Sequence, residues 1–333
     1  MIEVLLTKEE EALVTPQEAT TIAYGANRLN WKGKLYYYSQ ITRHLIKLNR
    51  FYRETLQKKE CYYGPFVGEF GHFLLHNLPF IAHLKKQDVK IHYCGMELHQ
   101  PFLVDETGNS ITESYCALRD FFSESKPLAN ETLVPQDVQK EIDLFKDEAN
   151  KSRLPFLDIS EKDMYWFTYR NWQLKGRQSK FDLNKLFKKS QIRSAVIFPR
   201  KKGGEFTPNN GGPWNYEQVA KALSPHFDKV YLVGHPSLSE DVDTAGNIEI
   251  KVSHNNRETM KYCAEAELIV TQHSGAVHIG AYVNTPVLVI FNGKPPIKGL
   301  IDTIRFRQNI AKDPLSYAFS LEEIENFARS LKN

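Results

Sequence analysis

Residues 269–293 read IVTQHSGAVHIGAYVNTPVLVIFNG. The apolar runs at residues 268–271 and 286–291 have the length of buried strands, and residues 277–283 between them repeat apolar side chains at helical spacing. A strand, a helix and a strand in this order form a βαβ unit, whose two strands are parallel. Because polar and small residues occupy positions 272–276, we expect these to form the turn between the first strand and the helix.

The same alternation precedes this stretch from residue 194 onward. Further strands are predicted at residues 195–199, 229–233 and 248–252, and further helices at residues 215–223, 257–266 and 321–331. Short strands separated by helices are typical of a parallel sheet that is buried on both faces. The sequence therefore predicts a Rossmann-like domain over residues 188–333.

The first part of the chain is predicted to form a second Rossmann-like domain over residues 1–187. Its strand, helix and strand fall at residues 64–69, 72–84 and 89–93. Before them, residues 35–38 are predicted as a strand and residues 40–57 as an amphipathic helix rich in Lys, Arg and aromatic side chains. We expect this helix to pack on its own domain with its basic residues toward solvent, and peripheral contact with a membrane is the alternative.

The composition excludes several classes of protein. Lys and Arg number 43 against 40 Asp and Glu in 333 residues, so no overall charge favours nucleic acid as a partner. The four cysteines contain no CxxC pair, which argues against a zinc site or a disulfide framework and favours buried free thiols in a reducing cytoplasm. No run of about eighteen apolar residues and no signal-peptide pattern occurs, so we expect a soluble cytoplasmic protein.

The turn at residues 272–276 is a candidate anion site. In open parallel sheets, ligands bind beyond the carboxyl ends of the strands, where backbone N–H groups and the helix dipole attract anions. Gly275 would let a phosphate approach the backbone, and Ser274 could cap the helix or donate to a phosphate oxygen. His273 or His278 could donate a charge-assisted hydrogen bond. The alternative is that Ser274 is only a helix cap and His278 only a core residue.

A basic loop follows the predicted strand at residues 195–199. Arg200, Lys201 and Lys202 precede two glycines, and cations on a flexible loop at the end of a strand suit a diphosphate without a metal ion. A solvated loop would have the same composition. Neither a GxxxxGK[ST] loop nor a GxGxxG turn opens this domain, so kinase-like and dehydrogenase functions lack support. Because the turn and the basic loop follow different strands of one sheet, together they favour a bound phosphate ligand.

Residues 67–79 hold a third group of polar side chains, at the end of a predicted strand in the N-terminal domain. Glu69 is placed for acid–base chemistry, with a surface or capping role as the alternative. His72 and His76 are four residues apart and would share a helix face. Because no third ligand has a suggestive spacing, no metal site is expected there.

Together, these motifs resemble the bacterial lipopolysaccharide heptosyltransferases of glycosyltransferase family 9, which are inverting nucleotide-sugar enzymes. Residues 273–278 (HSGAVH) resemble the family's Asp-Thr-Gly-x-x-His motif, and Thr285-Pro286 and residues 291–293 (FNG) follow in the order of the family's Thr-Pro and its apolar strand ending in Phe-Gly. Gly68-Glu69 and residues 76–79 (HNLP) resemble its first loop, and Lys201, Lys202 and Trp214 resemble its Lys-Arg-Trp-Pro element more loosely. The resemblance implies an α/β fold of GT-B type, with two Rossmann-like domains facing each other across a cleft.

The resemblance also implies roles for single residues. Glu69 would be the general base that deprotonates the acceptor hydroxyl, with His72 as the substitute base. The expected donor-binding residues, including those placed only by the ends of predicted strands, are Arg200, Lys201, Lys202, His235, Thr259, Met260, His273, Ser274, Gly275, Ala276 and His278. The expected partners are a nucleotide-sugar donor and a carbohydrate or glycoconjugate acceptor. No metal cofactor is expected, because basic side chains and backbone N–H groups would neutralise the leaving phosphate.

This sequence departs from the family at two of these positions. Glu69 stands where the family has an aspartate, and His273 replaces an aspartate that touches the donor sugar, which favours a sugar other than heptose. Two other functions stay open because a fold does not fix a function. One is a nucleotide-sugar epimerase or hydrolase of the same fold, and the other is a non-catalytic module that binds a carbohydrate or nucleotide.

Overall fold

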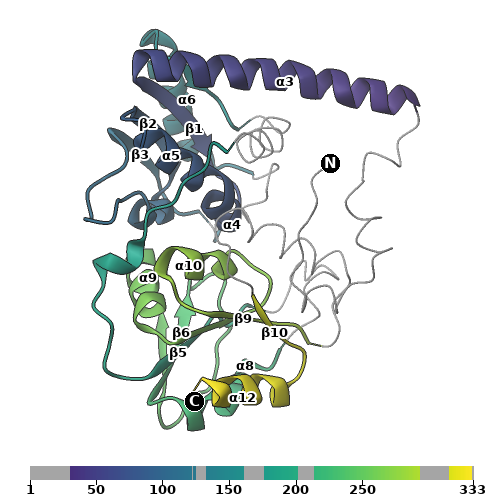
Figure 1. The fold of residues 1–333 in the computed structure, drawn as a ribbon, viewed down its shortest axis with the longest axis vertical. Coiled ribbons are helices and arrows are strands. Elements are labelled where there is room, and N and C mark those ends of the chain that lie inside the picture. Colours follow the sequence, from purple (N-terminus) through teal and green to yellow (C-terminus); the bar gives the residue numbers. More distant parts are fainter. Residues whose placement is uncertain are drawn as a thin grey trace. The chain divides into compact units, whose positions relative to one another are not determined.

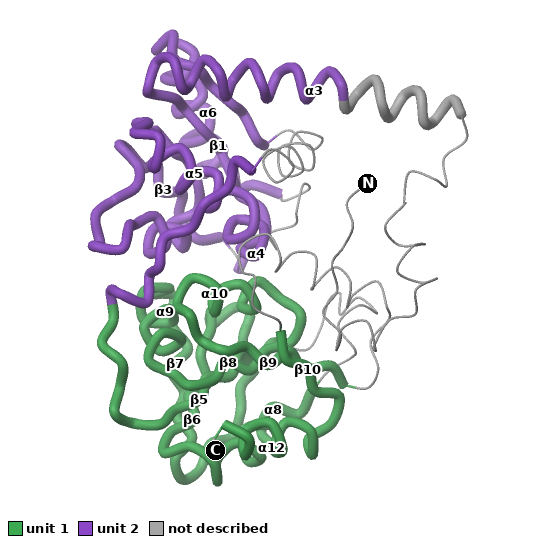
Figure 2. The backbone as a smooth tube through the Cα atoms, in the orientation of Figure 1, with its two compact units in different colours: residues 1–28, 187–333 green, residues 29–186 purple. Residues whose placement is uncertain are grey.

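The computed structural model describes residues 31–121, 123–124, 133–160, 176–201, 214–292 and 315–331, with side chains from residue 42 onward in the first helix. The described chain divides into unit 2, up to Leu186, and unit 1, from Phe187 onward (Figure 2). This division lies next to the domain boundary predicted between residues 187 and 188. Residues 1–30, which the prediction assigns to the N-terminal domain, lie outside the described residues.

Unit 2 contains a parallel sheet of four strands in the order β3-β2-β1-β4. The strands are β1 (Glu60–Phe66), β2 (Lys90–Met96), β3 (Ser114–Leu118) and β4 (Phe156–Leu157). The strand predicted at residues 64–69 begins earlier than expected, because the apolar and aromatic run that precedes Gly64 is buried throughout. As a result, Glu69 lies beyond the strand, in the loop at its carboxyl end.

The helices of unit 2 are α3 (Trp31–Lys58), α4 (Phe70–His72), α5 (Leu78–Lys85) and α6 (Gln136–Lys151), with a π-helix η2 (Phe73–Asn77) and 3₁₀ helices η3 (Glu97–Phe102) and η4 (Leu183–Leu186). The helix predicted at residues 72–84 is therefore present, with the π turn in its first half. Pro79 has no N–H to donate to the carbonyl four residues earlier, which accounts for the irregular turn.

The strand predicted at residues 35–38 is wrong, because these residues belong to α3. Their sequence, LYYY, has high strand propensity, but the helical pattern of residues 40–57 continues through it. Local propensity is overridden when a longer amphipathic helix includes the segment. Within the part of the chain that is described, no helix is long and apolar enough to cross a membrane.

Unit 1 contains a parallel sheet of six strands in the order β10-β9-β8-β5-β6-β7. The strands are β5 (Ser194–Ile197), β6 (Lys229–Gly234), β7 (Ile248–Val252), β8 (Leu268–Thr271), β9 (Val287–Ile290) and β10 (Ser316–Ala318). The helices are α8 (Tyr216–Leu223), α9 (Asn256–Glu265), α10 (Ala276–Val283) and α12 (Leu321–Ser330), with a 3₁₀ turn η6 (Ser224–His226). Every element predicted from residue 194 onward is confirmed within about two residues, the usual uncertainty of helix ends.

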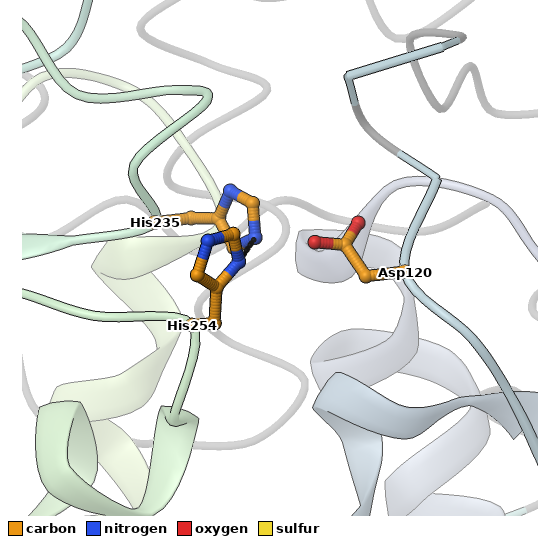
Figure 3. A group of neighbouring side chains, drawn as sticks. All are labelled: Asp120, His235 and His254. Atoms are coloured by element: carbon orange, nitrogen blue, oxygen red, sulfur yellow. Dashed lines mark hydrogen bonds between the residues drawn. The ribbon is translucent and has the colours of Figure 1, made fainter.

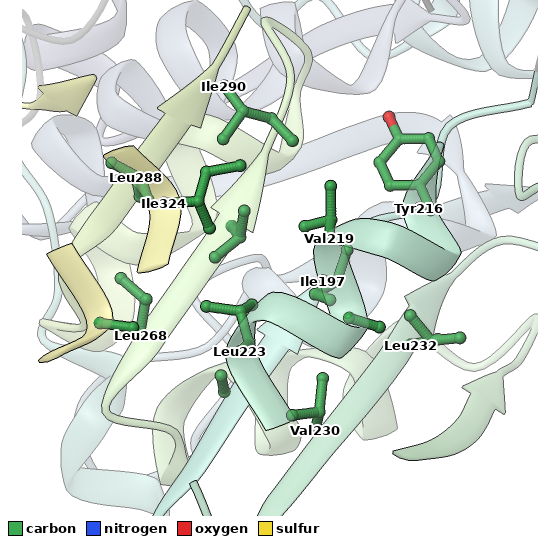
Figure 4. Close-up of a cluster of buried hydrophobic side chains, with 14 of the residues drawn as sticks. Ile197, Tyr216, Val219, Leu223, Val230, Leu232, Leu268, Leu288, Ile290 and Ile324 are labelled. Atoms are coloured by element: carbon green, nitrogen blue, oxygen red, sulfur yellow. The ribbon is translucent and has the colours of Figure 1, made fainter. Parts of the chain in front are cut away.

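Helices cover both faces of the unit 1 sheet, with α8 and α12 on one side and α9 and α10 on the other (Figure 1). Val219 and Leu223 of α8 and Ile324 of α12 pack on Ile197, Leu268 and other buried strand residues (Figure 4). The chain runs from β5 to β6 and β7 on one side, and then returns to β8, β9 and β10 on the other. The strand order therefore reverses between β5 and β8, the place where ligands bind in open parallel sheets.

Candidate functional site

The carboxyl ends of four neighbouring strands in unit 1 carry polar residues. Arg200 follows β5, His235 follows β6, His254 follows β7, and residues 272–275 follow β8. Parallel strands all end at the same edge of the sheet, so these side chains lie along one edge. The β5 and β8 loops flank the reversal of strand order, where the sequence places its anion site.

The loop after β8 forms the predicted turn and leads directly into α10. The hydroxyl of Ser274 accepts a hydrogen bond from the backbone N–H of Ala276 at 3.3 Å and lies 3.2 Å from the hydroxyl of Thr271. Gly275 has ordinary helical dihedrals, with φ −55°. The Ser274 side chain therefore satisfies one backbone N–H of the first turn of α10, and Gly275 is the N-cap residue. Capping leaves the positive end of the α10 dipole at the strand reversal, where an anion is favoured.

Arg200 ties the β5 loop to the β8 loop. Its Nη1 donates to the carbonyl oxygen of His273 at 2.8 Å. The exposed residue Lys201 donates its backbone N–H to the carbonyl of Leu238 at 2.9 Å, which joins the β6 loop to the same region. The structure thus brings Arg200, His273 and Ser274 together, while Lys202 lies outside the described residues.

His273 is neutral near pH 7. Burial, together with the positive charge of Arg200, lowers the pKa of His273 to about 4. Desolvation therefore disfavours the positive charge that a charge-assisted hydrogen bond from His273 needs. The ring can still donate or accept an ordinary hydrogen bond.

A second contact fixes the β8 loop from the opposite side and escaped the sequence prediction. The hydroxyl of Tyr216, in α8, donates to Oε1 of Gln272 at 2.6 Å, and both side chains are buried. Burial raises the pKa of Tyr216, so the hydroxyl keeps the proton that it donates. The position of Gln272 directly after a buried strand is the signal that could have identified it.

His235 and His254 form a hydrogen-bonded pair at the same edge (Figure 3). Nδ1 of His235 accepts from the backbone N–H of Ser237 at 3.2 Å, so the proton of the neutral ring lies on Nε2. That Nε2 lies 3.0 Å from Nδ1 of His254 and donates to it, which leaves the proton of neutral His254 on its own Nε2. The bonds fix both tautomers. Asp120, also drawn in Figure 3, belongs to unit 2 and is not assigned to the pair.

The sequence prediction missed His254, although its position after a predicted strand could have indicated it. Four other predicted donor-binding residues are buried inside unit 1, namely Thr259, Met260, Ala276 and His278. Their side chains pack within α9 and α10 and offer almost no surface to a ligand. The accessible part of the predicted donor site is therefore the edge formed by the loops after β5, β6, β7 and β8.

The predicted catalytic residues lie at the corresponding edge of unit 2. Glu69 immediately precedes α4, its side chain is 51% exposed, and its Oε2 lies 4.0 Å from Nε2 of His72. The rings of His72 and His76 stack, with 5.6 Å between their centroids. His76 is buried, and next to it Asn77 accepts a hydrogen bond from the hydroxyl of Tyr63 at 2.8 Å. Of this group, Glu69 is the group most accessible to a substrate.

No family model matches the chain, and no curated protein matches it by sequence. Among solved structures, the chain is similar to Escherichia coli heptosyltransferase WaaC with ADP-2-deoxy-2-fluoro heptose, at 11% identity and a TM-score of 0.50, over 82% of this chain and 98% of that chain. WaaC with ADP has the same identity and TM-score, over 81% and 99% of the two chains. These similarities confirm the predicted α/β fold of GT-B type with two Rossmann-like domains.

Proposed function

We propose that this protein is a glycosyltransferase that moves a sugar from a nucleotide-sugar donor to a carbohydrate or glycoconjugate acceptor, with inversion and without a metal ion. The observation that carries the proposal is the edge of unit 1, where Arg200 joins the β5 loop to the turn before α10. The fold supports it, since the two similar WaaC structures contain ADP and an ADP-sugar analogue.

The donor diphosphate is proposed to bind at the N-terminus of α10. Backbone N–H groups and the helix dipole stabilise its charge there, and Arg200 and the exposed Lys201 add positive charge. Lys202, the next residue in the sequence, belongs to the proposal as well. Toward β6 and β7, the Nε2–H of His254 would donate to an acceptor atom of the nucleoside.

The acceptor is proposed to react at the edge of unit 2. The acceptor hydroxyl oxygen attacks the anomeric carbon, Glu69 takes the hydroxyl proton, and the bonding electrons of the broken C–O bond go to the leaving diphosphate. The basic groups of unit 1 stabilise that developing charge, which is why no metal is required. His72 is the substitute base if Glu69 only positions the acceptor.

The donor sugar is proposed to differ from heptose. A neutral imidazole at His273 exchanges hydrogen bonds with sugar hydroxyls but carries no negative charge, unlike the aspartate of the family that this sequence resembles. A carboxylate holds hydroxyl donors more strongly than a neutral ring. The donor sugar that binds beside His273 should therefore differ from heptose in the arrangement of its hydroxyl groups.

The variant Glu69→Gln tests the transferase mechanism. It should lower kcat by about 100-fold or more while donor affinity changes little, because an amide cannot take a proton. Glu113→Gln, directly before β3 and thus at the opposite edge of the same sheet, is the matched control and should keep full activity. Equal activity of Glu69→Gln and the wild type would reject Glu69 as the base, and a loss confined to His72→Gln would assign the role to His72.

Incubation of the donor without an acceptor separates the two remaining functions. Proton NMR should show an unchanged donor apart from slow hydrolysis. Formation of an epimerised nucleotide-sugar would establish the epimerase function and contradict transfer. Donor binding without any turnover over a panel of carbohydrate acceptors would favour the non-catalytic module.

We extend the proposal to a cytoplasmic protein in peripheral contact with an anionic membrane. One face of α3 carries exposed residues at helical spacing, namely Arg43, Ile46, Lys47 and Arg50. Ile46 is 65% exposed among these cations, a combination that favours an interfacial helix. The cytoplasmic location is proposed because the spacing of the four cysteines is not that of a disulfide framework.

Co-sedimentation with phosphatidylglycerol vesicles tests this contact. Replacing Arg43 and Lys47 with Glu should weaken vesicle binding by about tenfold or more, since each cation near an anionic surface contributes about 1 kcal/mol. Replacing Lys221 and Arg329, exposed cations of unit 1, with Glu changes the net charge equally and should have a much smaller effect. Equal effects of the two double variants would rule out α3 as the contact.

A further inference from the structure

Two of the four cysteines are direct neighbours in the sheet of unit 2. Cys94 in β2 and Cys116 in β3 are register partners in adjacent parallel strands. Neighbouring strands lie about 4.8 Å apart, and Cα separations of about 4.4–6.8 Å are those that a disulfide can bridge. Cys94 belongs to the apolar cluster beneath α6, and Cys116 packs against the same cluster, so both thiols are on one face of the sheet.

The interaction between the two thiols changes their pKa values in opposite directions. A hydrogen bond between the two side chains raises the pKa of Cys94 and lowers the pKa of Cys116. The carboxylates of Glu141 and Glu148 on α6 oppose the lowering of the Cys116 pKa. Cys116 is therefore the thiol favoured as a thiolate, the form that reacts as a nucleophile.

Exposure separates Cys116 from the other three cysteines. Cys116 is half-buried on an edge strand, whereas Cys61, Cys94 and Cys263 are buried. Burial raises the pKa of Cys61 to about 12 and also raises the pKa of Cys263. A peroxide from solution does not readily reach thiols that are buried in apolar surroundings. An oxidant should therefore reach and react with Cys116 first.

We propose that Cys94 and Cys116 are a reversible redox pair, in which a peroxide oxidises Cys116 and Cys94 then closes an intramolecular disulfide. The Cys116 thiolate attacks one peroxide oxygen, the O–O bond breaks, and Cys116 becomes a sulfenic acid while an alcohol or water is released. The sulfur of Cys94 then attacks the sulfur of Cys116, the S–O bond breaks, and water leaves with the thiol proton. A dithiol reductant reverses the reaction and restores both thiols.

The disulfide would join the edge strand β3 to β2 just before the segment that carries His99. The strand β2 ends at Met96 and continues directly into η3, whose His99 stacks on Phe73. Oxidation would therefore link β2 and β3 covalently, next to the loops at the carboxyl edge of the unit 2 sheet. The pair does not depend on the proposed transferase function.

The test is thiol mapping of the full chain after treatment with hydrogen peroxide. The oxidised protein is unfolded, blocked with iodoacetamide and digested, and mass spectrometry should find a peptide pair joined through Cys94 and Cys116, with Cys61 and Cys263 alkylated. Brief alkylation of the untreated folded protein should modify Cys116 at least about tenfold faster than Cys61 or Cys263. Four alkylated cysteines under conditions that oxidise glutathione, or a disulfide to Cys61 or Cys263, would overturn the proposal.

Two variants separate the steps. In Cys94→Ser, the oxidation should stop at the sulfenic acid of Cys116, which dimedone traps as an adduct. Cys61→Ser, the matched control, should still form the Cys94–Cys116 disulfide to the wild-type extent. Absence of the dimedone adduct in Cys94→Ser, with the protein shown to be folded by circular dichroism, would contradict Cys116 as the first site of oxidation.

Discussion

At the scale of single residues, His99 is packed among aromatic side chains. Its ring lies face to face with Phe73, with 3.9 Å between centroids and 10° between planes, and Phe70 stacks beside it at 6.3 Å. Among the described residues, neither ring nitrogen of His99 has a hydrogen-bond partner. Burial lowers the pKa of His99 to about 3. His99 thus acts as a flat neutral ring that supports the segment directly after Glu69.

Replacing His99 with Phe should make the protein less sensitive to acid. In the unfolded chain the pKa of a histidine is about 6.5. As pH falls below that value, the unfolded chain binds a proton at residue 99, whereas the folded protein binds it only near pH 3. Stability from this residue is complete above pH 6.5 and is about 3 kcal/mol lower at pH 4.5. Urea unfolding of the variant and the wild type at pH 7.5 and 4.5 measures the loss of unfolding free energy between the two pH values. An equal loss in His99→Phe and the wild type would contradict the buried neutral ring.

Replacing Arg200 with Gln should weaken nucleoside diphosphate binding by about 10- to 100-fold, because a charged hydrogen-bond donor at the binding edge is lost. The matched control is Arg193→Gln. Arg193 precedes β5, at the opposite edge of the same sheet, and pairs with Glu267 at 2.9 Å. Calorimetric titration of both variants with nucleoside diphosphates measures the two affinities. Equal affinities in the two variants would show that the β5 loop is not part of the donor site.

At the scale of elements, the packing of α10 on β9 depends on Gly280. A Cβ at this position would lie 2.4 Å from Cγ2 of Val287 and 2.7 Å from the carbonyl oxygen of Thr285. Asn284 ends α10 in the left-handed conformation, and the hydroxyl of Thr285 donates to the carbonyl of Cys263 at 2.7 Å. The Thr-Pro of the sequence motif therefore fixes the far end of the helix whose N-terminus lies at the proposed phosphate site.

Replacing Gly280 with Ala should destabilise unit 1 by about 1–3 kcal/mol, because the backbone of Thr285 cannot move aside without shifting α10 or β9. Nucleoside diphosphate affinity should fall at the same time. Thermal unfolding and calorimetry measure the two effects. Wild-type stability in Gly280→Ala would mean that α10 lies farther from β9 than the contacts of Gly280 indicate.

Central strands were predictable because both faces are buried. The central strand β8, which is buried throughout, begins and ends at the predicted residues, whereas the edge strand β7 was predicted from its isoleucine and valine residues although it is partly exposed. The edge strands β3 and β10 were missed, because their residues are partly exposed and form no apolar run. The segment at residues 35–38 was assigned wrongly from local propensity alone. Buried runs thus specify the centre of a sheet better than its edges.

The candidate site was predictable only in part, because some of its contacts join residues that are far apart in the sequence. Arg200 and Ser274 follow strands, and the rule that ligands bind at strand ends identifies them. The bond from Tyr216 to Gln272 joins residues 56 positions apart, and that from His254 to His235 joins residues 19 apart. The neutral state of His273 depends on its burial. Contacts of this kind exist only in the folded chain and leave no local pattern.

At the scale of the whole molecule, the proposed chemistry is divided between two units. Unit 1 offers the edge with Arg200 and the α10 N-terminus, and unit 2 offers the exposed carboxylate of Glu69. Donor binding should therefore depend on unit 1 alone, whereas turnover requires groups from both. Donor binding and turnover can therefore be lost separately, and each can be measured in a variant that keeps the other.

The most direct test is a thermal-shift screen of the wild-type protein against ADP, UDP, GDP, CDP and dTDP. A ligand that binds only the folded state stabilises it by about 2.7 kcal/mol at 100 times its Kd. We predict that at least one nucleoside diphosphate raises the Tm and that Arg200→Gln lowers this shift while Arg193→Gln keeps it. No shift with any of the five, at millimolar concentration and with a folded protein, would contradict a nucleotide-sugar site in unit 1.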